Sequence, residues 1–222
     1  MRPQTNAQAK TSIPPGPAHQ PMLFGSCELK GASVPYYRNE EIYGEGEPVE
    51  YVYKVLSGSV RSYKLLSDGR RQINGFYLPG DVFGLELGPD HCSSTEALAD
   101  CSILVVKRST LLHAAERDSE VALSLLSLAV AELTRSRTRG LLLVKSAQER
   151  IAAFLLEMAE RFAAEGSVEL PMSRQDIADY LGLTIETVSR TLTQLVQSST
   201  IQLVASRQII LRNHLALSEL NN

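Results

Sequence analysis

The sequence predicts an α+β fold in three parts: an N-terminal β-roll, a long helix, and a C-terminal winged helix-turn-helix. Three observations carry this prediction. Short apolar runs punctuated by glycine fill residues 40–108, which is typical of an all-β barrel or roll. A proline-free run over 119–144 repeats apolar or small residues every three or four positions. Two short helical segments then meet at a glycine within 173–190 and precede a strand, a turn and a second strand.

Composition divides the chain into four segments. The first 25 residues contain five prolines and little hydrophobic pattern, so they cannot bury enough surface to fold alone. We expect a flexible Pro-rich arm over 1–25, the β-roll over 26–118, the long helix over 119–145 and the winged helix-turn-helix over 146–222.

Composition and charge also limit the function. With 44% hydrophobic and 21% charged residues the chain is ordinary globular protein, and it has neither a signal peptide nor a transmembrane run, so we expect a cytoplasmic location. Residues 146–222 hold six Lys and Arg against nine Asp and Glu, so any nucleic-acid binding must come from a local arrangement of arginines. The histidines are scattered and the cysteines are far apart in sequence (Cys27, Cys92 and Cys101), so we expect neither a metal nor a cofactor. The sequence also contains no recognisable pair of catalytic residues, so we do not expect an enzyme.

Helix-capping residues define the two helices of the 173–190 segment. Ser173 is placed to cap the first helix, with Asp176 three residues later at its positive end. Gly182 can adopt the positive φ that ends a helix, and Thr184 is placed to cap the second one. The pattern is therefore a helix-turn-helix.

The second helix has one apolar and one polar face. Val188, Leu192, Leu195 and Val196 fall within about 100° of arc, which leaves the polar face outward. An outward Arg can pair with guanine in the major groove, and a carboxylate can accept from a base amino group. We therefore expect four residues of this helix to contact DNA bases: Glu186, Ser189, Arg190 and Ile185. For Ile185 the contact would be with a thymine methyl group, and packing in the core is the alternative. A helix-stabilising ion pair between the Glu and the Arg is the alternative.

Residues around this face are candidates for phosphate contacts. The stretch 201–211 predicts a hairpin, to which 168–170 can add a third strand, so the arrangement is winged. The expected phosphate contacts are Ser173, Arg174, Gln175, Thr184, Thr187, Thr191 and, at the hairpin tip, Arg207.

The long helix carries a coiled-coil seam. Its spacing alternates between four and three, which predicts a two-helix dimer interface, although packing on the chain's own roll is the alternative. The seam consists of Ala122, Leu126, Ala129, Leu133, Ser136, Gly140 and Leu143. Ser146 and Glu149 form a capping-box pattern that begins another helix at 147.

Four segments, LSGSVRSY, GFYLPGDVFG, QERIAAFLLEMAERF and SRQDIADYLGLTIETVSRTL, resemble the CRP/FNR family of bacterial transcription regulators, and within it the FixK-like branch. The resemblance covers nearly the whole chain after the arm. It implies a cyclic-nucleotide-binding-like roll and a homodimer on a TTGAT-N4-ATCAA-like palindrome. It further implies RNA polymerase as a partner and a role, mainly as an activator, in low-oxygen, respiratory or nitrogen-fixation genes. The family's ExxSR pattern falls on Glu186, Ser189 and Arg190.

Two departures from the family argue against an effector. Only Cys27 lies in the first forty residues, whereas an iron–sulfur sensor needs a cysteine cluster there. The Gly-Glu and Arg-Ser pairs of the cyclic-nucleotide site are replaced by Gly84-Leu85 and His91-Cys92, with Glu86 one residue late. We therefore expect no small-molecule effector. A regulator gated by an unidentified small molecule or haem in the roll is the alternative.

Overall fold

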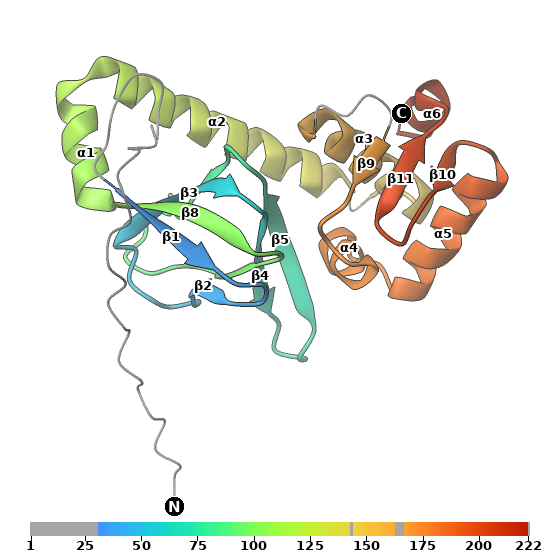
Figure 1. Cartoon of the computed structure of the whole chain (residues 1–222), viewed down its shortest axis with the longest axis horizontal. Helices are drawn as coiled ribbons and strands as arrows, with labels where there is room; N and C mark the ends of the chain where they lie inside the picture. Colours follow the sequence, from blue (N-terminus) through green and yellow to red (C-terminus); the bar gives the residue numbers. More distant parts are fainter. Residues whose placement is uncertain (1–30, 143, 163–166, 222) are drawn as a thin grey trace, which may run out of the picture.

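The computed structural model describes residues 31–142, 144–162 and 167–221 of the 222-residue chain. The predicted arm over 1–25 and Cys27 lie outside these ranges. Within them, a strand-rich N-terminal part is followed by long helices and a smaller C-terminal part (Figure 1). The first part comprises β1 (Ala32–Tyr36), β2 (Glu41–Tyr43), β3 (Tyr51–Ser57), β4 (Val60–Leu65), β5 (Arg71–Tyr77), β6 (Val82–Phe83), β7 (Ser94–Ala97) and β8 (Cys101–Lys107). The remainder comprises α1 (Arg108–Arg117), α2 (Ser119–Leu142), α3 (Ala147–Arg161), β9 (Ser167–Glu169), α4 (Arg174–Leu181), α5 (Ile185–Gln197), β10 (Ile201–Leu203), β11 (Gln208–Leu211) and α6 (His214–Asn221).

The N-terminal part is a roll of two antiparallel sheets, ordered β1-β8-β3-β6 and β2-β7-β4-β5. Inward side chains alternate along the strands, so that Val55, Val60 and Ile103 are fully buried between the sheets. Gly58 joins β3 to β4 with a φ of 80°, and a Cβ there would lie 2.4 Å from the Asp100 carbonyl oxygen. This turn therefore requires glycine. The β-roll predicted from the sequence is confirmed.

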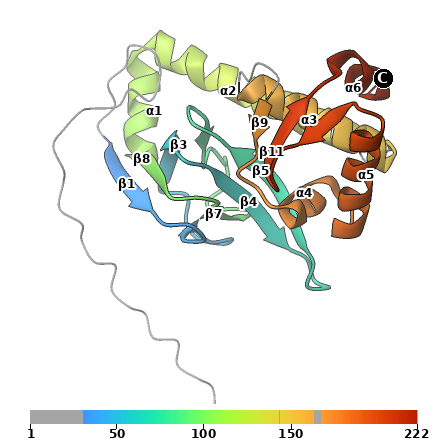
Figure 2. The same ribbon diagram turned by 45° about the vertical axis from the view of Figure 1, so that its right-hand side comes forward.

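Helix α2 runs beside the roll toward the C-terminal part (Figures 1 and 2). It ends at Leu142, three residues before the expected boundary at 145. Four residues later Ser146 has an extended ψ of 163° and caps α3. Its hydroxyl accepts the backbone N–H of Glu149 at 3.3 Å, and the capping box predicted from the sequence is present.

The C-terminal part packs α3, α4, α5 and α6 around a sheet ordered β10-β11-β9. The hairpin and the third strand were both predicted, so the winged arrangement is confirmed. Helix α6 was not predicted, although Asn213 before it supplies a signal, since its side-chain oxygen accepts the N–H of Ala216 at 3.0 Å. Among the described helices, none is both long and apolar enough to cross a membrane.

The C-terminal part also packs on strand β5 of the roll. The ring of Phe76 lies 5.1 Å from that of Tyr180 in α4 and 6.3 Å from that of Phe154 in α3, measured between centroids. Ile73 and Phe76 belong to the same hydrophobic cluster as the core of the helix-turn-helix. The roll and the C-terminal part therefore share buried apolar surface, which is a strong stabilising contribution.

Candidate nucleic-acid interface

The helix-turn-helix is built by the residues that the sequence predicts for it. The Ser173 hydroxyl accepts the N–H of Asp176 at 3.1 Å, which starts α4 at Arg174. Gly182 has a φ of 64° and ends that helix. Thr184 then accepts the N–H of Thr187 at 3.2 Å and starts α5. The turn is therefore tight, and it sets the two helices against one another.

The buried face of α5 differs from the expected one at two positions. Val188, Leu192 and Leu195 are buried as expected, but Val196 is 37% exposed. Thr191 is only 4% exposed, because it lies on the same face as Val188 and Leu195 at helical spacing. The expectation that Thr191 contacts a DNA phosphate is therefore corrected: its side chain belongs to the core.

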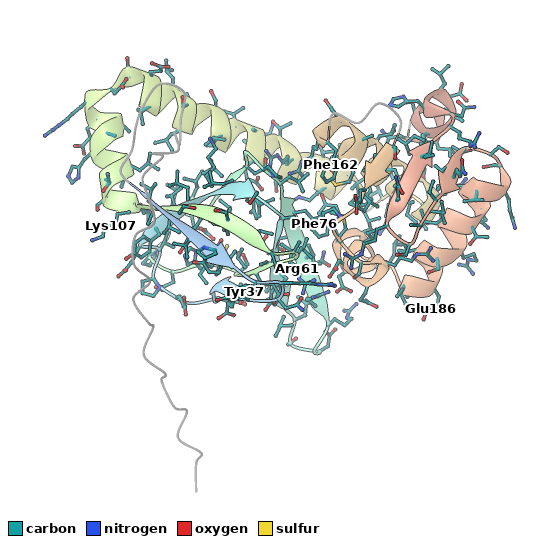
Figure 3. All side chains as sticks on the ribbon, viewed as in Figure 1. Tyr37, Arg61, Phe76, Lys107, Phe162 and Glu186 are labelled. Atoms are coloured by element: carbon teal, nitrogen blue, oxygen red, sulfur yellow. The ribbon has the colours of Figure 1, made fainter. Side chains whose placement is uncertain are left out.

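The outward face of α5 presents Glu186 and Arg190, both exposed (Figure 3 labels Glu186). Among the described residues no ion pair or hydrogen bond joins them, so a helix-stabilising pair is not supported. Hydrogen bonds from its own backbone N–H and from the Thr184 hydroxyl lower the pKa of Glu186. Glu186 is therefore an ionised acceptor and Arg190 an unengaged donor on one surface, with Ile185 at its edge, 37% exposed.

Ser189 is held by a contact that sequence reasoning missed. The Arg174 guanidinium of α4 donates to the Ser189 hydroxyl at 3.3 Å, and Ser189 is half-buried. The two residues are fifteen positions apart and lie on different helices, so no helical periodicity relates them. Arg174 therefore orients a residue that we expected to contact a base.

The remaining candidates for phosphate contacts lie in different surroundings. Thr184 and Thr187 share a hydroxyl–hydroxyl contact of 3.1 Å at the start of α5. Gln175 is exposed and donates to Asp179 at 2.7 Å. The Ser173 hydroxyl is engaged twice by Asp176, since it also donates to that carboxylate at 2.7 Å. Arg207 is half-buried and follows an exposed hairpin tip over 204–206.

A second candidate surface is the outer side of α2. Six predicted seam residues are exposed: Ala122, Leu126, Ala129, Leu133, Ser136 and Gly140. The seventh, Leu143, lies outside the described residues. The leucines are far from buried, with Leu126 60% and Leu133 52% exposed, and Val130 beside them is 54% exposed. The seam therefore does not pack on the chain's own roll, as the alternative interpretation required.

The residues near which the resemblance puts the second pair of the cyclic-nucleotide site, His91 and Cys92, contact other side chains of the roll. The His91 ring stacks on Tyr43 with centroids 3.6 Å apart, and its Nδ1 lies 3.2 Å from Glu86 Oε2. Cys92 Sγ lies 4.0 Å from the other oxygen of Glu86. Glu86 thus lies beside His91 and Cys92, although among the described residues neither its Oε2 nor the His91 Nδ1 makes a hydrogen bond.

Aromatic rings fill the neighbouring interior of the roll. Their centroids are 4.9–6.2 Å apart, and the rings are those of Tyr43, Tyr53, Tyr77 and Phe83. Within the described ranges, no group of three or more His, Cys, Asp and Glu is placed to hold a metal ion. The roll interior is therefore a packed core at this point.

Comparisons with known proteins agree with this architecture. Residues 149–220 match the family model of a Crp-like helix-turn-helix domain, and residues 33–118 match that of a cyclic nucleotide-binding domain. The nitrogen fixation regulation protein FixK of Azorhizobium caulinodans is 49% identical over 86% of this chain and 80% of its own length. The protein of the same name from Rhizobium meliloti is 44% identical over 84% and 86%. The structure of FixK2 from Bradyrhizobium japonicum superposes with a TM-score of 0.84 at 54% identity, covering 87% of this chain and 98% of that one.

These matches define the class of protein. A roll, a long helix and a Crp-like helix-turn-helix in this order make the chain a DNA-binding transcription regulator of the CRP/FNR family. Within that family it belongs to the FixK-like group.

Proposed function

We propose that this regulator reads a palindromic DNA site by inserting the start of α5 into the major groove. The observation that carries the proposal is the exposed pair of Glu186 and Arg190, which have complementary hydrogen-bonding chemistry and are not engaged with one another. Arg190 suits guanine, and Glu186 suits a base amino group. Ser189, oriented by Arg174, lies between them on the sequence and contacts a third position.

The proposed DNA site is palindromic because a symmetric homodimer binds two equivalent half-sites. The exposed stripe on α2 has the spacing of a two-stranded seam, and two copies joined along it would place two recognition helices in successive major grooves, about 34 Å apart. A site of the TTGAT-N4-ATCAA kind has this symmetry. The roll then presents a surface to RNA polymerase.

We further propose that no small-molecule effector is required. In the sequence, the family's Arg-Ser pair falls near His91 and Cys92, and aromatic rings pack in the neighbouring interior of the roll. These features favour an effector-independent regulator over one gated by a small molecule or haem, although the roll matches a family model described as cyclic nucleotide-binding.

The regulated genes are inferred from named relatives. Three of the matched proteins carry the name nitrogen fixation regulation protein. We therefore propose that this chain acts mainly as an activator of low-oxygen, respiratory or nitrogen-fixation genes.

The decisive experiment is a fluorescence-anisotropy titration of the untreated protein. The protein is titrated on a TTGAT-N4-ATCAA duplex and on a scrambled duplex at about 0.15 M salt, with no ligand added. We expect the palindrome to be preferred by about 10³-fold or more. Equal weak binding to both duplexes would contradict effector independence, and absorbance and mass spectrometry of the purified protein would then identify a bound haem or ligand.

Arg207→Ala tests the wing. If Arg207 contacts a phosphate, the change weakens binding to every sequence alike and flattens the slope of log K against log salt by about 1 for each subunit. Titrations at several salt concentrations on both duplexes measure this slope. Selective loss on the palindrome, with an unchanged slope, would show that Arg207 reads bases or shape instead.

A further inference from the structure

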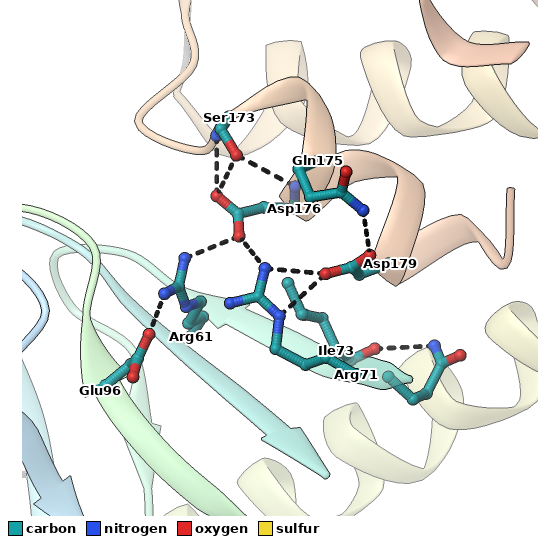
Figure 4. Close-up of polar contacts among 9 residues, drawn as sticks. Arg61, Arg71, Ile73, Glu96, Ser173, Gln175, Asp176 and Asp179 are labelled. Carbon is teal, nitrogen blue, oxygen red and sulfur yellow. Dashed lines mark hydrogen bonds and ion pairs between the residues drawn. The ribbon is translucent and has the colours of Figure 1, made fainter. Parts of the chain in front are cut away.

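A single carboxylate, that of Asp176, belongs both to the helix-turn-helix and to its contact with the roll (Figure 4). On one side it completes the cap of α4, where Oδ2 accepts the Ser173 backbone N–H at 2.9 Å and the Ser173 hydroxyl at 2.7 Å. On the other side Oδ1 accepts from two arginines of the roll, Arg61 and Arg71, each at 2.6 Å. The first helix of the DNA-binding motif is therefore tied to the roll at its N-terminus.

Arg61 of β4 makes the more buried of these two contacts. Its side chain is 11% exposed and that of Asp176 is 4% exposed. A second carboxylate, Glu96 of β7, pairs with the other end of the same guanidinium. The arginine is thus held between one acidic residue of the roll and one of the helix-turn-helix, and removing it would take one of two arginine partners from the buried Asp176 carboxylate.

Arg71 of β5 makes a forked contact with α4. One terminal nitrogen lies 2.6 Å from Asp176 and 2.8 Å from Asp179, and Nε donates to Asp179 at 2.8 Å. Beside it, the Gln72 side chain donates to the Tyr180 carbonyl oxygen at 3.4 Å. Several directional contacts along one helix specify its orientation more tightly than apolar packing alone.

The electrostatics of Asp176 agree with this geometry. Burial raises the pKa of its carboxyl, but hydrogen bonds from Ser173 and the charges of Arg61 and Arg71 lower it further than burial raises it. The carboxylate is therefore ionised in the docked arrangement. Through α4, the contact extends to the recognition helix, because Arg174 donates to Ser189.

We propose that Arg61 and Arg71 are positioning residues for DNA binding. They hold α4 against the roll through Asp176 and Asp179, and so set the orientation of α5 toward the groove without a ligand in the roll. Neither residue has to touch DNA for this role. The inference rests on the proposed function. It explains how a roll without an effector still sets the orientation of the recognition helix α5.

The test compares three variants of the full-length protein: Arg61→Gln, Arg71→Gln and the matched control Arg70→Gln. Arg70 neighbours Arg71 in sequence, but its side chain is 78% exposed and, among the described residues, pairs only with Asp68 in the same turn. Anisotropy titrations on the palindrome give the affinity and its salt slope. Hydrogen–deuterium exchange without DNA reports the protection of α4 and of β5.

We expect Arg61→Gln and Arg71→Gln to weaken palindrome binding by about tenfold or more, to leave the salt slope unchanged and to speed exchange in α4. Arg70→Gln is expected to match the unmodified protein in all three measurements. Arg71→Lys keeps the charge but not the forked contact, so it should weaken binding and speed exchange in α4 by a smaller amount. If a glutamine variant fails to fold, this lysine variant provides the test.

Three results would overturn the inference. One is wild-type affinity and exchange in the Arg61 and Arg71 variants, and another is wild-type affinity in Arg71→Lys if the glutamine variants do not fold. The third is a loss of affinity accompanied by a flattened salt slope and unchanged exchange, because it would make these arginines phosphate contacts. Failure of the proposed function is separate, since it would appear as equal binding of the unmodified protein to palindromic and scrambled DNA.

Discussion

Replacing Leu126 and Leu133 together by Asp is expected to produce a monomer that binds the palindrome about 10²–10⁴-fold more weakly. The two leucines lie seven positions apart on the exposed stripe of α2, with 60% and 52% of their surfaces accessible. In the proposed dimer both would be covered by the partner helix, where buried carboxylates are strongly unfavourable. A monomer would then bind each half-site separately and lose the gain in affinity that comes from linking two DNA-binding domains.

Light scattering coupled to size-exclusion chromatography measures the mass, and anisotropy measures the affinity. The matched control is Ser127→Asp with Thr134→Asp, which introduces the same two charges at the same spacing on exposed positions about 100° around the helix. The control should remain a dimer with unchanged affinity. A dimeric Leu126 and Leu133 variant with normal affinity would contradict the α2 interface.

Replacing Arg190 by Ala is expected to cost roughly 1–3 kcal/mol on the palindrome and to relax discrimination at one base pair. The guanidinium is exposed, and among the described residues it makes no hydrogen bond or ion pair, so its removal breaks nothing inside the protein. The loss should therefore appear in DNA binding and not in the free energy of unfolding.

Titrations on the palindrome, on single-base variants of each half-site and on scrambled DNA measure this effect. Arg190→Lys should recover charge attraction but not discrimination, because an ammonium cannot make the bidentate pair with guanine. Arg207→Ala provides the contrast, since its loss is expected on all sequences. If Arg190→Ala weakened specific and scrambled DNA equally, Arg190 would be a phosphate contact and not a base-reading residue.

The parts of the fold that could be predicted from sequence are those governed by near neighbours. Ser173, Gly182 and Thr184 mark the ends of α4 and α5 because caps and positive-φ positions act within one helical turn. Heptad spacing placed Leu126 and Leu133 on one stripe of α2 in the same way, but only the structure decided that the stripe does not pack on the roll. Thr191 was misplaced because its polarity suggested solvent, whereas its helical position, between Val188 and Leu195 on the inner face, put it in the core.

The sequence by itself therefore determined the order of the roll, the long helix and the winged helix-turn-helix, the caps of the helix-turn-helix and the outward face that carries Glu186 and Arg190. Only the tertiary structure decided which residues of the roll meet that motif. Arg61 and Arg71 lie 115 and 105 positions before Asp176, and nothing in local spacing relates them. The physical reason is that capping and periodicity act between residues close in the chain, while pairing across such a distance depends on how the roll and the helices pack together as a whole.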